Sequence, residues 1–388
     1  MQKSLDRKLA AIHADPSGAS DFIIADAKDA DMGFGIRAPG LSQERLPNGE
    51  RRYKTLAEYR QQIREVIAQG IVDIVLMSSS TSEKLTIEER LFDDSPITPA
   101  ARANDTSDVH LPRGGTVHLE PARFFRSAGI DHMQCGHLDC EPHERNRGVD
   151  LGLYSLTFNN RLELDLPMLE QFKLFREEAE RKGFRYFLEV FDPNIPDAVD
   201  PKLLPGFIND SIVRTLAGVS SAGRPVFLKI VYHGPQAMEE LVTYDPHLVV
   251  GVLGGSAGTT LDAFQLLYEA KKYGARAALF GRKINHAEHQ LAFIEFLRHI
   301  ADGVIEPAEA VRAYHAVLQK LKIPPNRSLE DDLVLQTNVM SYGGSGTTIS
   351  LPTPPGNVPS NGTPDFAGMS SEQRLDYHRN RLNLKFGE

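Results

Sequence analysis

The chain of 388 residues has no run of apolar residues that approaches the length of a membrane span. A transmembrane helix needs about 18 or more consecutive, mostly apolar residues, so the sequence argues against a membrane protein. The N-terminal stretch 1–18 is polar and lacks the apolar core of a signal peptide. We therefore expect a cytoplasmic protein with no membrane partner.

Cysteine and excess positive charge are also scarce. Cys135 and Cys140 are the two cysteines of the chain, and one pair cannot supply the disulfide framework of a small secreted domain, which agrees with a reducing compartment. The formal net charge is -9, whereas binding to a nucleic-acid backbone depends on an excess of Lys and Arg. We expect no nucleic-acid partner, although a local positive pocket for a small phosphorylated ligand is compatible with this charge.

From residue 149 onward, apolar runs typical of strands alternate with amphipathic helices. Strands are predicted at 149–158, 185–191, 225–232, 248–253 and 275–280, and two more near the N-terminus at 21–27 and 72–77. This alternation is typical of repeated β/α units around a parallel sheet. The predicted fold class is therefore α/β, a (β/α)8 TIM barrel with one strand still to be located.

The missing strand should come from the irregular insertion at 78–148. The stretches 116–120 and 129–135 are the two candidates, and the residues do not choose between them. A doubly wound open sheet is the rival architecture, but no G-x-G-x-x-G follows the first strand. A helix is expected to begin at Asp165, and Asn285 is expected to cap the last helix of the barrel.

The C-terminal part differs in composition. We predict that the barrel spans 1–322 and that 323–388 forms an extended arm ending in a short helix. Within the arm, 343–363 has nine Gly or Pro among 21 residues and no charge. Such a composition cannot bury a core of its own. We expect the arm to hold neighbouring subunits together in a homo-oligomer.

Lys229 lies within an otherwise apolar run, "VFLKIVY" (226–232). In an ordinary strand, such a lysine packs its stem and extends its amine to the strand end. The strands of a parallel barrel are buried on both faces, so a lysine near the carboxyl end either forms a salt bridge or enters the active-site mouth. Burial lowers the pKa of an amine, and a neutral amine can attack a carbonyl to form a Schiff base. Lys229 is therefore the candidate nucleophile.

Glycine-rich turns follow the last two predicted strands, in "GVLGGSAGTT" (251–260) and "LFGRKINH" (279–286). Backbone N–H groups at Gly254, Gly255 and Gly281, near helix N-termini, can hold a phosphate, and Arg282 can add charge-assisted hydrogen bonds. One glycine-rich turn is weak evidence, but a pair on the last two strands is the usual phosphate site of this fold.

The succession "FLEVF", "FLKIVY", "GVLGGSAG" and "GARAALFGRKI" resembles the class I, Schiff-base-forming aldolases of the archaeal-type fructose-bisphosphate aldolase and tagatose-bisphosphate aldolase group. The resemblance covers roughly residues 149–303. It implies a (β/α) barrel, no metal or other cofactor, and a lysine on the sixth strand that forms an imine with a ketose or dihydroxyacetone-type carbonyl. That lysine corresponds to Lys229, and the phosphate loops correspond to Gly254, Gly255 and Ser256 and to Gly281 and Arg282.

The resemblance also indicates proton-transfer groups. Glu189 matches a glutamate of the tagatose-bisphosphate branch, and Asp26 matches an aspartate of the fructose-bisphosphate branch. The alternative for Glu189 is that it only balances the charge of Lys229. The alternative for Asp26 is that it caps a helix or holds a loop. The fructose-bisphosphate branch has a tyrosine acid where this chain has Phe191, so Glu189, Tyr154 or Tyr232 would have to serve instead.

The segment "DHMQCGHLDCEPHE" (131–144) gathers potential zinc ligands, with Asp139 beside them: His132, Cys135, His137, Cys140 and His143. Structural zinc sites usually draw on two ligand pairs separated by a longer loop. The simpler interpretation is a metal-free loop beside the barrel mouth.

We therefore expect an aldolase-type lyase that acts on a sugar or sugar phosphate in carbohydrate metabolism. A metal-dependent lyase or hydrolase that uses the 132–143 cluster and zinc is one alternative. A non-catalytic barrel that binds a sugar phosphate is another. The sequence does not name the substrate, because one barrel hosts many reactions through changes in its loops.

Overall fold

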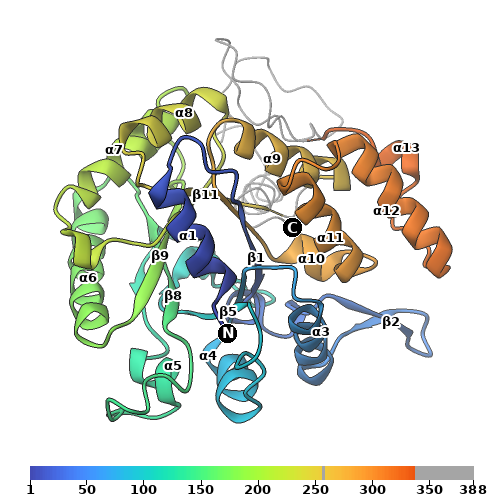
Figure 1. The fold of residues 1–388 in the computed structure, drawn as a ribbon, viewed down its shortest axis with the longest axis horizontal. Coiled ribbons are helices and arrows are strands. Elements are labelled where there is room, and N and C mark those ends of the chain that lie inside the picture. Colours follow the sequence, from blue (N-terminus) through green and yellow to red (C-terminus); the bar gives the residue numbers. More distant parts are fainter. Residues whose placement is uncertain (256–257, 337–388) are drawn as a thin grey trace.

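Eight parallel strands close into a barrel in the computed structural model, which describes residues 1–255 and 258–336 (Figure 1). Going round the barrel, the strands follow the order β1, β12, β11, β10, β9, β8, β5 and β4, and β4 pairs again with β1. Each of these strands is followed by at least one helix before the next begins. The predicted (β/α)8 barrel is confirmed.

The barrel strands are short and are separated by helices and two small hairpins. The barrel strands are β1 (Ile23–Lys28), β4 (Ile74–Met77), β5 (Thr98–Arg102), β8 (Leu151–Thr157), β9 (Arg185–Phe191), β10 (Leu228–Ile230), β11 (Val250–Leu253) and β12 (Ala277–Phe280). The hairpin strands are β2 (Leu41–Arg45) with β3 (Arg51–Tyr53), and β6 (Asp105–Thr106) with β7 (Phe124–Phe125). The helices are α1 (Ser4–Ala14), α2 (Asp31–Phe34), α3 (Leu56–Gln69), α4 (Ser79–Ser82), α5 (Ile130–Cys135), α6 (Leu162–Arg181), α7 (Leu204–Leu216), α8 (Pro235–Tyr244), α9 (Thr260–Lys272), α10 (Arg282–His286), α11 (Gln290–Ala301), α12 (Pro307–Leu321) and α13 (Leu329–Asp332).

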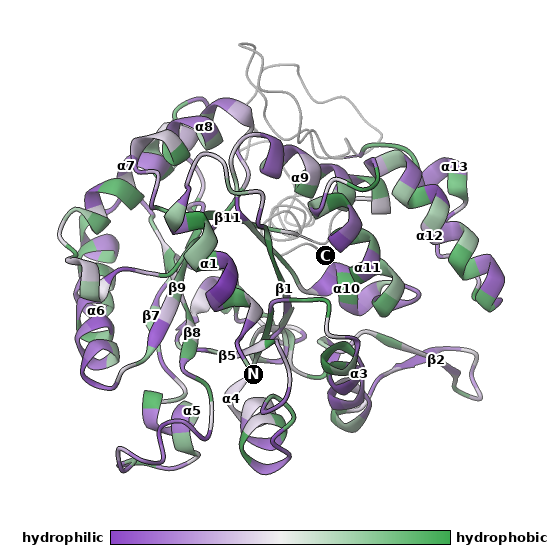
Figure 2. Ribbon diagram, viewed as in Figure 1, coloured by the Kyte–Doolittle hydropathy of each residue, from purple (hydrophilic) through white to green (hydrophobic). Residues whose placement is uncertain are grey.

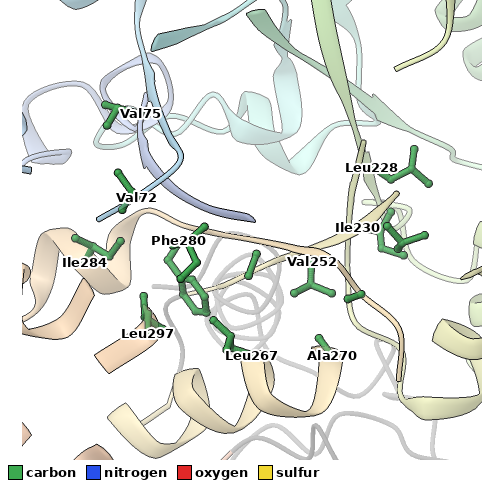
Figure 3. Packing of buried hydrophobic residues seen from close by; sticks show 14 of the residues in the cluster. Val72, Val75, Leu228, Ile230, Val252, Leu267, Ala270, Phe280, Ile284 and Leu297 are labelled. Carbon is green, nitrogen blue, oxygen red and sulfur yellow. The ribbon is translucent and has the colours of Figure 1, made fainter. Parts of the chain in front are cut away.

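Alternate residues of each strand belong to different layers, because successive side chains point to opposite faces. One face fills the barrel interior. Helix α1 packs against the interior at the amino ends of the strands through Leu5 and Leu9, which share a cluster with interior residues such as Ala25. The other face packs against the surrounding helices. Figure 3 shows this outer layer, where Phe280 of β12 lies near Leu297 of α11. The strands β1 and β11 are accordingly hydrophobic in Figure 2, and helices α6 and α12 carry hydrophilic residues as well.

The eighth strand is β5, and neither predicted candidate is a barrel strand. Residues Val117–Leu119 form a single 3-10 turn and Ile130–Cys135 forms helix α5. Strand β5 has the sequence TPAAR, which lacks the β-branched and aromatic richness of a typical strand and contains Pro99. Its pairing with β4 and β8 is therefore imposed by closure of the barrel.

Two predicted helix starts also differ from the structure. Helix α6 begins at Leu162, three positions before Asp165, whose carboxylate instead accepts hydrogen bonds from the N–H groups of Asn159 (2.8 Å) and Arg161 (3.3 Å). Asn285 lies inside the short helix α10. The cap of α11 is His289, whose Nδ1 accepts a hydrogen bond from the N–H of Ala292 at 3.1 Å.

Part of the predicted C-terminal arm packs on the barrel. Asp332 of α13 accepts a hydrogen bond from the Thr260 N–H at 2.7 Å, and its other oxygen lies 2.9 Å from Nε2 of His315. The Gly/Pro-rich stretch and the predicted terminal helix lie outside the described residues, so the arm and its role in a homo-oligomer stay predictions. Within 1–255 and 258–336, no helix is long and apolar enough to cross a bilayer.

Candidate functional site

A cavity opens at the carboxyl ends of the barrel strands, where the active sites of this fold lie. It is bounded by strand ends, by the loop after β1 and by the insertion after β5. The residues that line it include Ala27, Asp29, Phe34, Arg102, Asp105, His110, Phe125, Glu189, Phe191, Lys229, Gly254, Gly255, Gly281 and Arg282. Charged side chains of both signs thus face one space that is otherwise apolar.

Lys229 and Glu189 form a buried ion pair on this cavity. The two residues are register partners on β10 and β9, and Nζ of Lys229 lies 2.5 Å from Oε1 of Glu189. Ser155, the register partner of Glu189 on β8, donates a hydrogen bond from Oγ to Oε2 at 2.6 Å. Each carboxylate oxygen of Glu189 therefore has its own polar partner, which fixes the plane of the carboxylate beside the amine.

A second ion pair borders the first. Arg102, the last residue of β5, donates from Nε to Oδ2 of Asp29 at 2.6 Å, and its NH2 lies 3.8 Å from Oε2 of Glu189. Burial lowers the pKa of the Arg102 guanidinium, but the carboxylates of Asp29 and Glu189 outweigh burial and raise it. These two ion pairs place two cations and two carboxylates on the cavity, beside Asp105 and Arg282, which also line it.

The sequence prediction missed Arg102 and Asp29. Asp29 follows Ala27 on the inward face of β1, so counting alternate residues past the strand end would have indicated it. Arg102 belongs to the strand that the sequence pattern did not reveal.

The glycine turns and Arg282 lie where the phosphate-site prediction placed them. Gly254, Gly255, Gly281 and Arg282 all line the cavity. A side chain at Gly281 would place its Cβ 2.6 Å from the carbonyl oxygen of Ala27, so the backbone approaches closely there. Arg282 is buried with its guanidinium 4.6 Å from the centroid of the Phe34 ring. Ser256 lies outside the described residues.

Asp26 does not line the cavity. Its neighbours Ala25 and Ala27 face the barrel interior, whereas Asp26 pairs with Lys28 (3.2 Å), whose amine also donates to Asn285 of α10. Asp26 therefore lies between the barrel and its helices. Burial raises the pKa of its carboxyl to about 6, and the charge of Lys28 opposes this shift.

Tyr154 also faces away from the site. Its ring stacks on Phe175 of α6 with centroids 4.3 Å apart, in the same outer layer that holds Tyr232. Burial raises the pKa of the Tyr154 hydroxyl. The structure thus brings Lys229 together with Glu189 but separates both tyrosine candidates from it, because they occupy outward positions of their strands.

A histidine and an aspartate meet just beyond β9 and β10. Nε2 of His233 lies 2.9 Å from Oδ1 of Asp192. Burial lowers the pKa of His233, but the carboxylate of Asp192 outweighs burial and raises it. The sequence analysis did not single out this pair, whose residues follow the strands of Glu189 and Lys229.

The 132–143 cluster lies at the opposite end of the barrel. Asp131 of this segment pairs with Lys182 at 3.0 Å, and Lys182 lies three positions before the first residue of β9. Cys135 and Cys140 are joined in a disulfide, so their sulfurs are not the thiolates that bind metal. Within the described chain, the potential ligand atoms that gather within 4.8 Å belong to Cys135, His137 and Glu144.

These observations correct two expectations about the cluster. His132 and His143 do not belong to the compact group, and the segment does not border the mouth, because it connects α5 to the amino end of β8. The disulfide does not support a reducing compartment, and the cytoplasmic location stays a prediction.

Comparison with solved structures finds class I aldolases. An archaeal fructose 1,6-bisphosphate aldolase matches with a TM-score of 0.53 and 13% identity over 77% of this chain and 100% of the other. A fructose-bisphosphate aldolase from Slackia heliotrinireducens matches with a TM-score of 0.55 and 12% identity over 81% and 91% of the two chains. The chain has the fold of these aldolases.

One of the matching structures contains an archaeal aldolase with its catalytic lysine bound covalently to a carbinolamine intermediate, at a TM-score of 0.53 and 13% identity over 77% of this chain and 100% of the other. No protein-family model and no curated protein sequence matches this chain. At such identities the likeness establishes the fold, and the chemistry has to be argued from the cavity itself.

Proposed function

We propose that the protein is a class I aldolase-type lyase that cleaves or forms a carbon–carbon bond through a Schiff base on Lys229. The observation that carries this proposal is the Lys229–Glu189 pair inside the barrel mouth, with 2.5 Å between amine and carboxylate. A lysine nucleophile needs an adjacent group that takes up its proton, and Glu189 is within direct reach. The aldolase fold of the structural neighbours supports the same chemistry.

The proposed reaction begins when Glu189 accepts a proton from the Lys229 ammonium. The neutral amine adds to a ketone carbon, and the carbinolamine loses water, for which Glu189 returns the proton to the departing hydroxyl. Cleavage of the adjacent carbon–carbon bond moves its electron pair into the iminium and leaves an enamine, while a base takes the proton of the β-hydroxyl and an aldehyde departs. Protonation of the enamine and addition of water then release the second product and restore Lys229.

Two groups around the pair, Ser155 and Arg102, support the proposed role of Glu189. Ser155 holds one oxygen of Glu189 and leaves the other toward the amine. Arg102 places a positive charge 3.8 Å from Oε2 of Glu189, within reach of an electrostatic attraction to the carboxylate. The proposed chemistry uses no metal and no organic cofactor.

A phosphorylated substrate is favoured by the far side of the cavity. Gly254, Gly255 and Gly281 line this side at strand ends, and the guanidinium of Arg282 is buried beside them, a combination that suits an oxyanion. We therefore propose a sugar phosphate or a related phosphorylated keto compound as substrate.

Reductive trapping tests this proposal. The protein is incubated with dihydroxyacetone phosphate or with a panel of phosphorylated ketoses, reduced with borohydride, and mapped by peptide mass spectrometry. A stable adduct on Lys229 is expected, and Lys229→Met should lose it. Lys84, an exposed lysine paired with Glu88, provides the matched control, because Lys84→Met should keep the adduct.

Absence of any adduct on Lys229 across the panel would contradict the Schiff-base mechanism. If the phosphorylated compounds then still bound with Lys229 intact, the alternative of a non-catalytic sugar-phosphate-binding barrel would replace it.

A further inference from the structure

A second cavity lies beside the first, on the outer side of the barrel mouth. The β2–β3 hairpin, helix α3 and the segment α10–α11 enclose it (Figure 1). Phe34 and Arg282 line both cavities and so form the wall between them. Lys229 and Glu189 do not line the second cavity.

The second cavity is rich in positive charge. Its basic residues are Arg37, Arg51, Lys54 and Arg282, and its acidic residues are Glu65 and Glu288. Glu288 accepts hydrogen bonds from the hydroxyl of Tyr314 (3.0 Å) and the N–H of Asn326 (2.6 Å), and the four cations outnumber the two carboxylates of the lining. The protein as a whole carries a net charge of -9, so this local excess of cations runs against the average of the chain.

Two of these cations lack a carboxylate partner within the part of the chain that the structure describes. Arg51 donates from Nε to the carbonyl oxygen of Ser42 at 2.6 Å, which leaves its other nitrogens for further contacts. Lys54, half-buried, makes no side-chain hydrogen bond or ion pair to a described residue. Burial, together with the nearby charge of Lys28, lowers the pKa of Lys54 to about 8.

Arg52, which lies between them on the hairpin, shows the contrast. Its guanidinium bonds to Glu44 (2.7 Å) and to Glu58 (2.8 Å), and it does not line the cavity. Successive residues of a strand point to opposite faces. The hairpin thus pairs its outward arginine with carboxylates, while Arg51 faces a cavity with no carboxylate partner of its own among described residues.

We propose that this second cavity binds an organic phosphate, a small molecule with at least two negative charges, which Arg51 and Lys54 hold from the side of the hairpin. A phosphoryl group satisfies several cations at once through charge-assisted hydrogen bonds. The apolar part of the ligand would contact Leu41, Tyr53 and Leu291, which also line the cavity. The proposal does not depend on the chemistry at Lys229.

Titration calorimetry of the full chain with inorganic pyrophosphate tests the proposal. Arg51→Gln and Lys54→Gln should each weaken binding by roughly tenfold or more, the loss expected from one charge-assisted hydrogen bond. Arg52→Gln is the matched control and should bind as the unmodified protein does. Pyrophosphate held in the first cavity would be insensitive to Arg51 and Lys54, because neither lines that cavity.

Lys229→Met separates this proposal from the aldolase proposal, since it should keep pyrophosphate binding at the second cavity. Equal affinity of the Arg51→Gln, Lys54→Gln and Arg52→Gln variants, or no pyrophosphate binding by the unmodified protein, would overturn the inference. Circular dichroism of each variant excludes misfolding as the cause of a loss, and Lys54→Gln serves if Arg51→Gln does not fold.

The pH dependence provides a second readout. Lys54→Arg keeps its charge at all accessible pH values, whereas Lys54 with a pKa of about 8 is mostly neutral at pH 9. Between pH 7 and pH 9, binding to the unmodified protein should weaken by about tenfold relative to Lys54→Arg. Ligand ionisation affects both proteins equally and cancels in this ratio. A constant ratio would show that Lys54 does not contact the anion and would count against the proposed site.

Discussion

Nζ of Lys229 lies 2.5 Å from Oε1 of Glu189, on neighbouring strands at the same register position. The residues are 40 positions apart in the sequence, and the parallel pairing of β9 with β10 brings them into contact. Ser155 on the next strand completes a row that orients the carboxylate. This row is the structural basis of the predictions about proton transfer.

Replacing Glu189 by Gln keeps the shape of the side chain but removes its proton acceptor. Imine formation on Lys229, followed as the rate of borohydride-trapped adduct, should slow by about 100-fold to 10,000-fold, the usual contribution of a general base. Glu178→Gln is a suitable control, because Glu178 pairs with Arg126 and Lys182 and does not line the cavity. Trapping at an unchanged rate in Glu189→Gln would assign Glu189 to charge balance alone.

Arg282→Gln tests the phosphate grip of the first cavity. KM for a phosphorylated ketose should rise by roughly tenfold to 100-fold, since a charge-assisted hydrogen bond to the phosphate is lost. A non-phosphorylated ketose of the same chain length should show little change. If both substrates were affected equally, Arg282 would act through the shape of the site and not through the phosphate.

Asp26→Asn tests the placement of Asp26 outside the cavity. The variant should retain trapping on Lys229 within a few-fold of the unmodified protein, because Asp26 points toward α10 and α11. A loss comparable to that of Glu189→Gln would return Asp26 to the reaction.

The same variant should reveal a pH-dependent difference in stability. Burial raises the folded-state pKa of Asp26 to about 6, so the unfolded state releases its proton first as the pH rises from about 4 to 6. Unfolding then becomes easier, and the free energy of unfolding of the unmodified protein, relative to Asp26→Asn, should fall by up to about 3 kcal/mol across this window. Above pH 6 the difference should level off. Denaturant titrations of both proteins at several pH values measure it.

Reduction of the Cys135–Cys140 disulfide should leave the proposed chemistry intact. The bridge closes a short loop at the amino ends of the strands, so its removal should lower the free energy of unfolding by about 2 kcal/mol. Trapping on Lys229 should proceed at the same rate in Cys135→Ser/Cys140→Ser, with or without a chelator. A dependence of trapping on added zinc would revive the metal-dependent alternative.

Much of the barrel could be predicted from the sequence, because each long strand is a recognisable apolar run followed by an amphipathic helix. Strand β5 could not be predicted, because its sequence TPAAR carries little hydrophobic signal. It pairs because its neighbours β4 and β8 are both present. Lys229 could be singled out for a related reason, because a charged residue inside an apolar run stands out where both faces of a strand are buried, whereas Glu189 was indicated by the resemblance to aldolases.

Because the barrel strands are buried on both faces, the sequence did not show whether a given side chain points into the barrel or toward the surrounding helices. Asp26 and Tyr154 occupy outward positions, and Asp29 and Arg102 occupy inward ones, but the apolar runs around them show no alternation that would separate the two faces. The second cavity could not be predicted either, because Arg51 and Lys54 line the same cavity as Arg282 only when the hairpin folds back beside the barrel.

The sequence by itself determined the β/α alternation and the position of the buried lysine, because local hydrophobicity and spacing govern both. The tertiary structure alone decided which carboxylates meet that lysine, that the cysteine–histidine segment lies at the far end of the barrel, and that Arg51 and Lys54 share a second cavity. These depend on strand register and closure, and such contacts between distant residues leave no mark on the local pattern of the chain.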